Sequence, residues 1–163
     1  MPTMAPSDDT PPTTRRRFLG ETAAVASGFA LWLTVKPAAA TPETMHAALK
    51  RVVGEASLKK GKIKLDLPPL VENGNVVPMT VTVDSPMTAE DHVRAIHVFN
   101  EKNPQPNVVG VHLGPRAGRA AIATRIRLAD TQTVTAVAEL SDGTFWTDSI
   151  QVIVTLAACV ENL

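Results

Sequence analysis

The sequence has a single cysteine, Cys159, among its 163 residues. One thiol cannot form a disulfide within its own chain, so no internal crosslink stabilises this fold. Four residues follow Cys159, and a side chain this near the end of a chain is scarcely available to fill a core. The thiol is therefore either inert or the working group of the molecule, and the pattern alone leaves both open.

The sequence also lacks an excess of charge of either sign. The whole chain has 16 basic and 16 acidic residues, and residues 41–163 have 12 and 13, a net charge of −1. Without a basic excess, the composition indicates neither a nucleic-acid partner nor binding to a membrane surface. No internal repeat or low-complexity segment is present either.

No hydrophobic run is long enough to be a convincing membrane span. The apolar stretch 23–35 is too short and too rich in Ala, Gly and Thr. It follows TRRRFL at 14–19, which holds a twin arginine, and it precedes three alanines at 38–40. This order is typical of a bacterial twin-arginine export signal, so we expect residues 1–40 to be a signal peptide and the protein to be periplasmic. An uncleaved anchor is the alternative.

Export through the twin-arginine pathway carries folded cargo, so we expect the protein to gain a cofactor or a partner subunit before export. The periplasm is oxidising and favours paired cysteines. A single cysteine there indicates either pairing with another molecule or a free reactive thiol.

The exported segment opens with a predicted short helix. Thr41 can cap it, Pro42 suits the first helical position, and Glu43 favours the positive end of the helix dipole. Apolar residues then recur at helical spacing and form one stripe that can dock on the domain. Gly61 is expected to end this helix.

Beyond the helix the apolar residues alternate, which predicts half-buried strands. Pro78 in the first long strand indicates a sheet edge. Turn signals separate the strands, as at 72–74, 103–106 and 141–143. The predicted strands cover 62–67, 76–84, 92–99, 108–113, 122–128, 133–140 and 150–156.

About seven short strands without interleaved helices predict an all-β fold, an antiparallel β-sandwich preceded by the short helix. We place this domain at 41–156. The last strand alternates cleanly to Leu156, after which Ala157, Ala158, Cys159 and Val160 begin a short tail. The sequence thus predicts a C-terminal arm, residues 157–163, that presents Cys159 from the end of a rigid strand.

Four stretches together resemble the SoxY family, the sulfur-carrying subunit of the SoxYZ complex of thiosulfate oxidation. These are VPMTVTVDSPMT at 77–88, HVRAIHVFNEKNP at 92–104, HLGPR at 112–116 and RIRLADTQTVTAVAELSDGTFW at 125–146. With the export signal and the terminal cysteine, the resemblance covers nearly the whole chain.

The resemblance implies an immunoglobulin-like sandwich that forms a heterodimer with a SoxZ-like subunit. It implies that Cys159 is the covalent attachment point for sulfur intermediates and that the chain itself is no enzyme and needs no cofactor or metal. It also implies transient contacts with three enzymes: a haem c enzyme that couples thiosulfate to the thiol, a hydrolase that releases sulfate, and a sulfane dehydrogenase.

The arm departs from the family's best-known ending, Gly-Gly-Cys-Gly-Gly. Here Ala157 and Ala158 precede Cys159, and Val160 follows it. Alanine does not reach positive φ as glycine does, so we expect a stiffer arm. Glu161 and the terminal carboxylate are negative charges that by themselves raise the pKa of a nearby thiol.

Other candidate groups have simpler explanations. His92, His97 and His112 lack a metal-binding spacing and are expected to be surface or interface residues. Arg125 and Arg127 project from one face of a strand, where they suit a sulfonate or an acidic partner, although a solvated sheet face explains them too. Phe145 and Trp146 are expected to pack in the core or at a subunit interface, and Asp84-Ser85 has no suitably spaced histidine for a hydrolase.

The residues alone leave two other hypotheses. In the first, the chain is a binding or assembly module whose terminal cysteine makes an intermolecular disulfide. In the second, it is a thiol-dependent enzyme, which the absence of a visible base or second cysteine disfavours.

Overall fold

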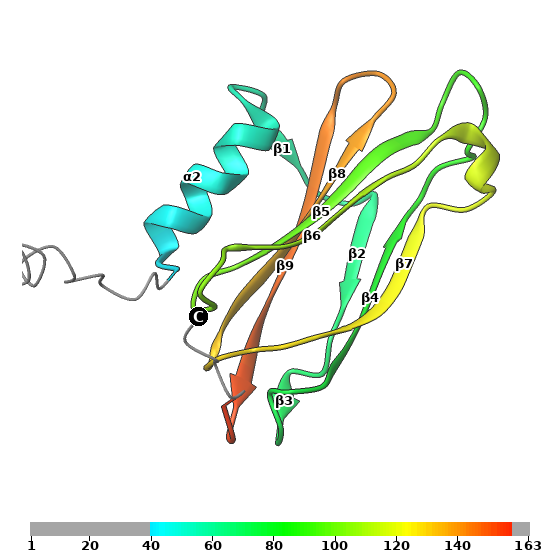
Figure 1. Ribbon diagram of the computed structural model, residues 1–163. Helices are drawn as coiled ribbons and strands as arrows, with labels where there is room; N and C mark the ends of the chain where they lie inside the picture. The colour runs from blue at the N-terminus through cyan, green and yellow to red at the C-terminus, as the bar shows by residue number, and fades with distance from the viewer. Residues whose placement is uncertain (1–39, 158–163) are drawn as a thin grey trace, which may run out of the picture. The chain divides into compact units, whose positions relative to one another are not determined.

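The computed structural model describes residues 40–157 (Figure 1). The predicted signal peptide up to residue 39 and the arm residues Ala158, Cys159 and Val160 lie outside this range. Within it, no helix is both long and apolar enough to cross a membrane.

Two sheets form the fold, and they face each other as the layers of a sandwich (Figure 1). The larger has the strand order β1-β9-β8-β5-β6, with β3 also paired to β9, and the smaller has the order β2-β4-β7. All pairs are antiparallel except β1–β9 and β3–β9. The strands are β1 (Leu58–Lys59), β2 (Ile63–Asp66), β3 (Leu70–Val71), β4 (Val77–Val83), β5 (Val93–Asn100), β6 (Asn107–His112), β7 (Ala121–Ile126), β8 (Gln132–Leu140) and β9 (Phe145–Val154).

The core lies between the sheets and follows the predicted alternation. In β4 every second side chain is buried, and in β8 the same period places Val134, Ala136, Ala138 and Leu140 inside. Burying each such side chain contributes roughly 1–3 kcal/mol, so these strands account for much of the stability. The predicted all-β, immunoglobulin-like sandwich with a short N-terminal helix is confirmed.

The helix α2 (Pro42–Val53) covers part of the outer face of the larger sheet (Figure 1). Thr41 caps it as predicted, because its hydroxyl accepts the backbone N–H of Thr44. Met45 and Val53 pack on Phe99 of β5 and Val137 of β8. The centre of the larger sheet is therefore buried on both faces, which explains why Val137 is buried out of alternation.

The helix ends at Gly54 and not at Gly61, so that prediction is wrong. Gly54 has a φ of 64°, a positive value that glycine adopts at no steric cost, and its N–H donates to Lys50 O. Lys59, two residues before Gly61, belongs to β1, a short strand that the sequence did not reveal.

Pro78 does not mark an edge strand, because β4 is the central strand of the smaller sheet. Its pairing with β2 ends at Asp66–Thr80, two residues short of Pro78. The proline therefore lies where β4 pairs with β7 alone, opposite Arg125. The short 3₁₀ helix η2 (Pro115–Ala117) then leads towards β7.

Candidate functional site

The structure describes the base of the predicted arm and its first residue, Ala157, which is exposed. The strand β9 ends at Val154, two residues earlier than the alternation indicated. Leu156 is 62% exposed and is not a core residue. The predicted attachment residue Cys159 and its neighbours Ala158 and Val160 lie outside the described residues, so their geometry stays a prediction.

Two segments hold the chain immediately before the arm. The N–H of Thr155 donates to Val71 O at 3.0 Å, which continues the β3–β9 pairing by one residue. The N–H of Gly74 donates to Leu156 O at 2.8 Å. The backbone is therefore hydrogen-bonded to neighbouring segments through Leu156.

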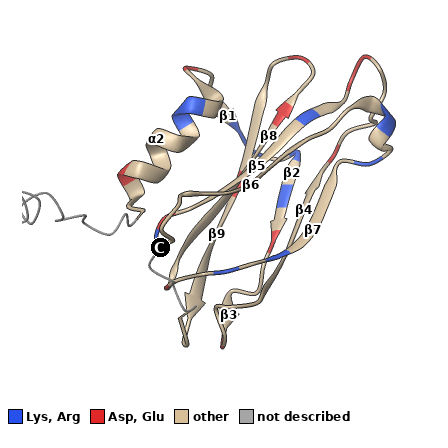
Figure 2. Cartoon of the chain, in the orientation of Figure 1, with Lys and Arg blue, Asp and Glu red and all other residues tan. Residues whose placement is uncertain are grey.

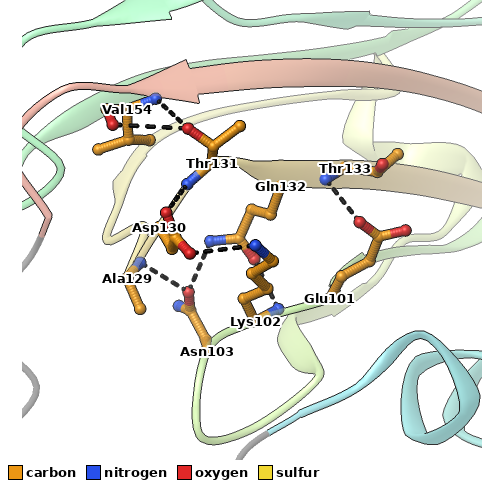
Figure 3. Close-up of polar contacts among 9 residues, drawn as sticks. All are labelled: Glu101, Lys102, Asn103, Ala129, Asp130, Thr131, Gln132, Thr133 and Val154. Atoms are coloured by element: carbon orange, nitrogen blue, oxygen red, sulfur yellow. Dashed lines mark hydrogen bonds and ion pairs between the residues drawn. The ribbon is translucent and has the colours of Figure 1, made fainter.

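On its other side β9 is held by Thr131, in the loop before β8. The N–H of Val154 donates to Thr131 Oγ1 at 3.0 Å, and the hydroxyl donates to Val154 O at 3.5 Å. Figure 3 shows this pair as part of a polar cluster from two neighbouring loops, the start of β8 and the end of β9. The cluster consists of Glu101, Lys102, Asn103, Ala129, Asp130, Thr131, Gln132, Thr133 and Val154.

Asn103 is the centre of this polar cluster. Its Oδ1 accepts the N–H of Ala129 and the side-chain amide of Gln132, each at 3.0 Å, and its own amide donates to Arg127 O. Lys102 Nζ lies 3.0 Å from Asp130, and this hydrogen bond holds the pKa of the Asp130 carboxyl below its usual value. The cluster joins the β5–β6 loop to the β7–β8 loop and stiffens the arm's base.

Exposed apolar side chains gather close to this base. Leu70 and Ile153 are register partners of β3 and β9 and are 57% and 52% exposed. Leu156 lies two residues beyond the end of β9 and accepts a hydrogen bond from the N–H of Gly74. Val76, which is also exposed, lies two residues after Gly74. An apolar patch of this kind is typical of a surface that another protein covers.

Arg125 and Arg127 are exposed, and Ile126 between them is buried, as the alternation predicts. Within residues 40–157 neither arginine forms an ion pair. With Asn103, Pro104, Gln105, Asn107, Val108 and Ile126 they line a hollow of about 420 Å³. Figure 2 shows basic segments here and on α2, β1 and β2, with acidic segments also on α2 and β2.

Two of the three candidate histidines lie close together on the larger sheet. His97 of β5 and His112 of β6 lie on neighbouring strands with ring centroids 6.0 Å apart. Burial, followed by the nearby His112, lowers the pKa of His97. His92 precedes β5, and its buried Nδ1 has no hydrogen-bond partner among the described residues. In the part of the chain that the structure describes, no three His, Cys, Asp or Glu residues form a potential metal site.

The two aromatic residues of β9 pack as expected for core residues. Phe145 packs against the buried apolar side chains beneath α2, and Trp146 packs against the core between the two sheets. Lys59 and Lys62 stand over the Trp146 ring at 5.8 and 5.5 Å from its centroid, which is cation–π geometry.

The sequence did not reveal the polar cluster. Residues 103–106 indicated only a turn, and Thr131 and Gln132 had no visible role. The available signal was the concentration of Asn, Gln, Asp and Thr in two loops next to strands that end near the arm, because such side chains bond to backbone groups.

The chain matches the family model described as "Sulfur oxidation protein SoxY" over residues 49–159. No curated protein sequence matches it significantly. Among solved structures, it is similar to the sulfur carrier protein SoxY from Chlorobium limicola f thiosulfatophilum, with a TM-score of 0.60 and 24% identity over 71% of this chain and 100% of that one.

Two superoxide reductases share the fold more distantly. The neelaredoxin from Ignicoccus hospitalis has a TM-score of 0.52 and 16% identity, over 58% of this chain and 80% of that one. A putative superoxide reductase from Thermotoga maritima has a TM-score of 0.50 and 23% identity, over 60% of this chain and 93% of that one. Identities this low establish the sandwich alone, whereas the family match covers more than half of the chain and ends on its only cysteine. The chain therefore belongs to the SoxY family of sulfur oxidation proteins.

Proposed function

We propose that this protein is a periplasmic carrier that holds sulfur intermediates of thiosulfate oxidation covalently on Cys159. The observation that carries the proposal is the family match, which runs through the whole sandwich to residue 159. The chain is a substrate carrier and no enzyme, and its arm presents the thiol to separate enzymes in turn.

The base of the arm suits this presentation. Among residues 40–157, Leu156 is the last one held by a backbone hydrogen bond, and Cys159 stands three residues later in the sequence. Three residues span at most about 10 Å when extended, so the thiol reaches well beyond the strand end. A fixed base and a short free segment together limit the volume that the thiol samples and still let it enter another protein's active site.

The carried group follows from thiol chemistry. Thiosulfate and the Cys159 thiolate join through a new S–S bond, and the two electrons released pass to a haem c enzyme. Water then cleaves the terminal S–S bond of the sulfonate in a hydrolase, which releases sulfate and two protons and leaves a persulfide on Cys159. A sulfane dehydrogenase oxidises the remaining sulfur. The carrier itself supplies only a thiolate.

A SoxZ-like subunit is the proposed permanent partner, exported together with this chain through the twin-arginine pathway. The exposed apolar residues near the arm's base (Leu70, Val76, Ile153 and Leu156) are one surface that such a partner can bury. Basic groups of a partner are needed near the thiol, because the negative charge of Glu161 disfavours an approaching anion. Neither nucleic acid nor a membrane is a proposed partner.

Intact-protein mass spectrometry tests the proposal. Protein from the periplasm of cells grown with and without thiosulfate is measured before and after reduction. We expect thiosulfonate or sulfane-sulfur adducts that map to Cys159, require thiosulfate and are lost on reduction. A bare thiol under both conditions, or only a disulfide dimer, contradicts the carrier role.

The Cys159→Ser variant separates the carrier from the alternative assembly module. A carrier still folds, still binds its partner subunit, and loses thiosulfate-dependent respiration completely. An assembly module that depends on an intermolecular disulfide loses the complex itself, which size-exclusion chromatography under non-reducing conditions detects.

A further inference from the structure

The strand β7 has a free edge, because it pairs with β4 alone. The other long strands at sheet edges are protected or interrupted. In β2, the N–H of Leu65 donates to the Asp148 carboxylate of β9 at 2.8 Å, and the two-residue strands β1 and β3 lie along β9 itself. In β6, Gly110 interrupts the side chains, and the pairing with β5 shifts register between Val98 and Phe99. β7 has no proline, glycine or register shift, and such an unprotected edge is a template for another strand.

The hydrogen-bond pattern fixes which backbone groups of β7 point outwards. The N–H of Val83 in β4 donates to Ala120 O, so the residues that bond to β4 are those an even number of positions after Ala120. The other residues of the strand direct their N–H and C=O groups away from β4. These outward residues are Ala121, Ala123 and Arg125, and their backbone groups have no partner among the described residues.

The open part of the edge is short and accessible. It ends at Arg127, whose carbonyl oxygen accepts the side-chain amide of Asn103 at 2.8 Å. Ala123, Thr124 and Arg125 are exposed, so no described segment covers the edge before that point. Each outward residue offers one donor and one acceptor at the spacing of an extended backbone. The chemistry of this edge therefore selects a peptide strand as its occupant.

A hollow of about 580 Å³ lies along β4 and β7 next to this edge. Its lining consists of Pro78, Met79, Thr80, Ala123, Thr124 and Arg125. Several of these side chains are small, and none of them carries a negative charge. The hollow therefore leaves room for the side chains of an added strand.

The charges beside the edge decide between a second copy of this chain and a different protein. Residues 116–127 hold four arginines and no acidic residue, and none of the four forms an ion pair within residues 40–157. Two copies that paired antiparallel about Ala123 would bring the flank of β7 with Arg119 beside the other copy's flank with Arg127. Like charges across a strand pair destabilise it. The edge therefore disfavours its own copy and favours an acidic strand.

We propose that an extended acidic segment of another protein pairs antiparallel with the free edge of β7. Ala121, Ala123 and Arg125 exchange backbone hydrogen bonds with this segment, and its carboxylates lie opposite Arg125 and beside Arg127. Side chains on one face of a strand alternate with those on the other, so these carboxylates stand at every second position. The interaction goes beyond the carrier role and does not depend on whether Cys159 carries sulfur.

A synthetic peptide of alternating glutamate and valine, blocked at both ends, is the probe. In an antiparallel pair, the residue whose side chain lies opposite Arg125 also directs its backbone towards β7. N-methylation of the glutamates therefore removes the N–H groups that the edge needs, whereas N-methylation of the valines leaves them intact. We expect the unmodified and valine-methylated peptides to bind to the full chain, and the glutamate-methylated peptide to bind roughly tenfold more weakly. A peptide of alternating lysine and valine should not bind.

Amide NMR of the full chain locates the bound peptide. We expect hydrogen exchange to slow at Ala121, Ala123 and Arg125, whose N–H groups gain a partner. Exchange at Ile122 and Thr124 should change little, because these residues already bond to β4. Protection at neither set, or equal binding of the two methylated peptides, overturns the proposal.

Two double variants test the charge. R125Q/R127Q should weaken binding of the unmodified peptide roughly tenfold, because two exposed ion pairs are lost. K60Q/K64Q is the matched control, since it removes the same charge from exposed lysines outside β7, one of them on β2 at the opposite edge of the same sheet. We expect this control to bind the peptide as the original protein does. An equal loss in both double variants shows attraction to the overall charge alone and refutes a site at β7.

Discussion

Val154 and Thr131 are joined by two hydrogen bonds, in which the N–H of Val154 donates to the threonine hydroxyl and the hydroxyl donates to Val154 O. Val154 is the last residue of β9, and Thr131 stands in the loop that leads into β8. One side chain thus satisfies both backbone groups at the point where the strand gives way to the arm.

Replacing Thr131 by valine keeps the shape of the side chain and removes both hydrogen bonds. We expect the free energy of unfolding to fall by about 1–2 kcal/mol, because the half-buried backbone groups of Val154 lose their partner. Urea unfolding measures the loss, and amide hydrogen exchange at Val154 should accelerate. Thr133→Val is the control, since the Thr133 hydroxyl makes no hydrogen bond within residues 40–157; an equal loss in both variants refutes this role for Thr131.

Replacing two buried amide residues near the arm's base, Asn100 and Gln132, with leucine should change the free energy of unfolding in opposite directions. Asn100 is completely buried, and neither its Oδ1 nor its Nδ2 has a hydrogen-bond partner among the described residues. Gln132, 2% exposed, accepts the N–H of Lys102 and donates to Asn103.

We expect Asn100→Leu to raise the free energy of unfolding by about 1–3 kcal/mol, since it removes an uncompensated desolvation cost. Gln132→Leu should lower it by about 1–3 kcal/mol, because the Lys102 N–H is left without a partner. Denaturant melts of both variants measure the difference. A destabilised Asn100→Leu protein would show that Asn100 is satisfied by ordered water.

The strands were predictable from the sequence because their apolar residues have a period of two, and in β4 and β8 this period matches the buried residues closely. The two-residue strands β1 and β3 have too few residues to show a period. Gly54 and Gly61 both have positive φ, and the sequence does not indicate which of them ends the helix.

The site was predictable only in part. The alternation predicted that Arg125 and Arg127 are exposed on either side of a buried Ile126, and this holds although β7 ends at Ile126. The contacts of Thr131 with Val154 and of Asn103 with Gln132 join residues 23 and 29 positions apart, and they depend on how the loops meet after the sheets have packed. No local pattern encodes such a meeting.

His97 should make stability depend on pH. Burial and His112 lower its pKa in the folded protein, whereas the unfolded chain has the ordinary value near 6.5. Between these two values the unfolded state binds more protons, so the free energy of unfolding should decrease as the pH falls below about 6.5. NMR titration of the His97 imidazole gives the folded pKa directly, and urea unfolding between about pH 7.5 and about pH 5.5, one unit either side of the ordinary value, gives the dependence of the free energy of unfolding on pH.

Two variants test the cause of this pH dependence. His97→Gln should remove the contribution of His97. His112→Gln should raise the pKa of His97, because it removes the neighbouring positive charge, and should thereby reduce the dependence. A His97 titration midpoint at or above 6.5 contradicts the predicted direction.

The arm's alanines offer the final prediction. Ala157 is exposed and makes no hydrogen bond within the described range, and Ala158 follows it before the thiol. Replacing both with glycine gives the backbone access to positive φ on the approach to Cys159. We expect the double variant to react several-fold faster with the haem c enzyme that couples thiosulfate, since more orientations of the thiol become accessible.

The two glycine substitutions should leave the stability of the folded domain unchanged. Because Leu156 still holds the strand end through Gly74, the free energy of unfolding of the Ala157→Gly/Ala158→Gly variant should stay within about 0.5 kcal/mol of the original. Val160→Gly, on the far side of the thiol, tests bulk separately. If glycine leaves the coupling rate unchanged while Val160→Gly raises it, the limit at this arm is the size of the residue after Cys159 and not the stiffness of the two residues before it.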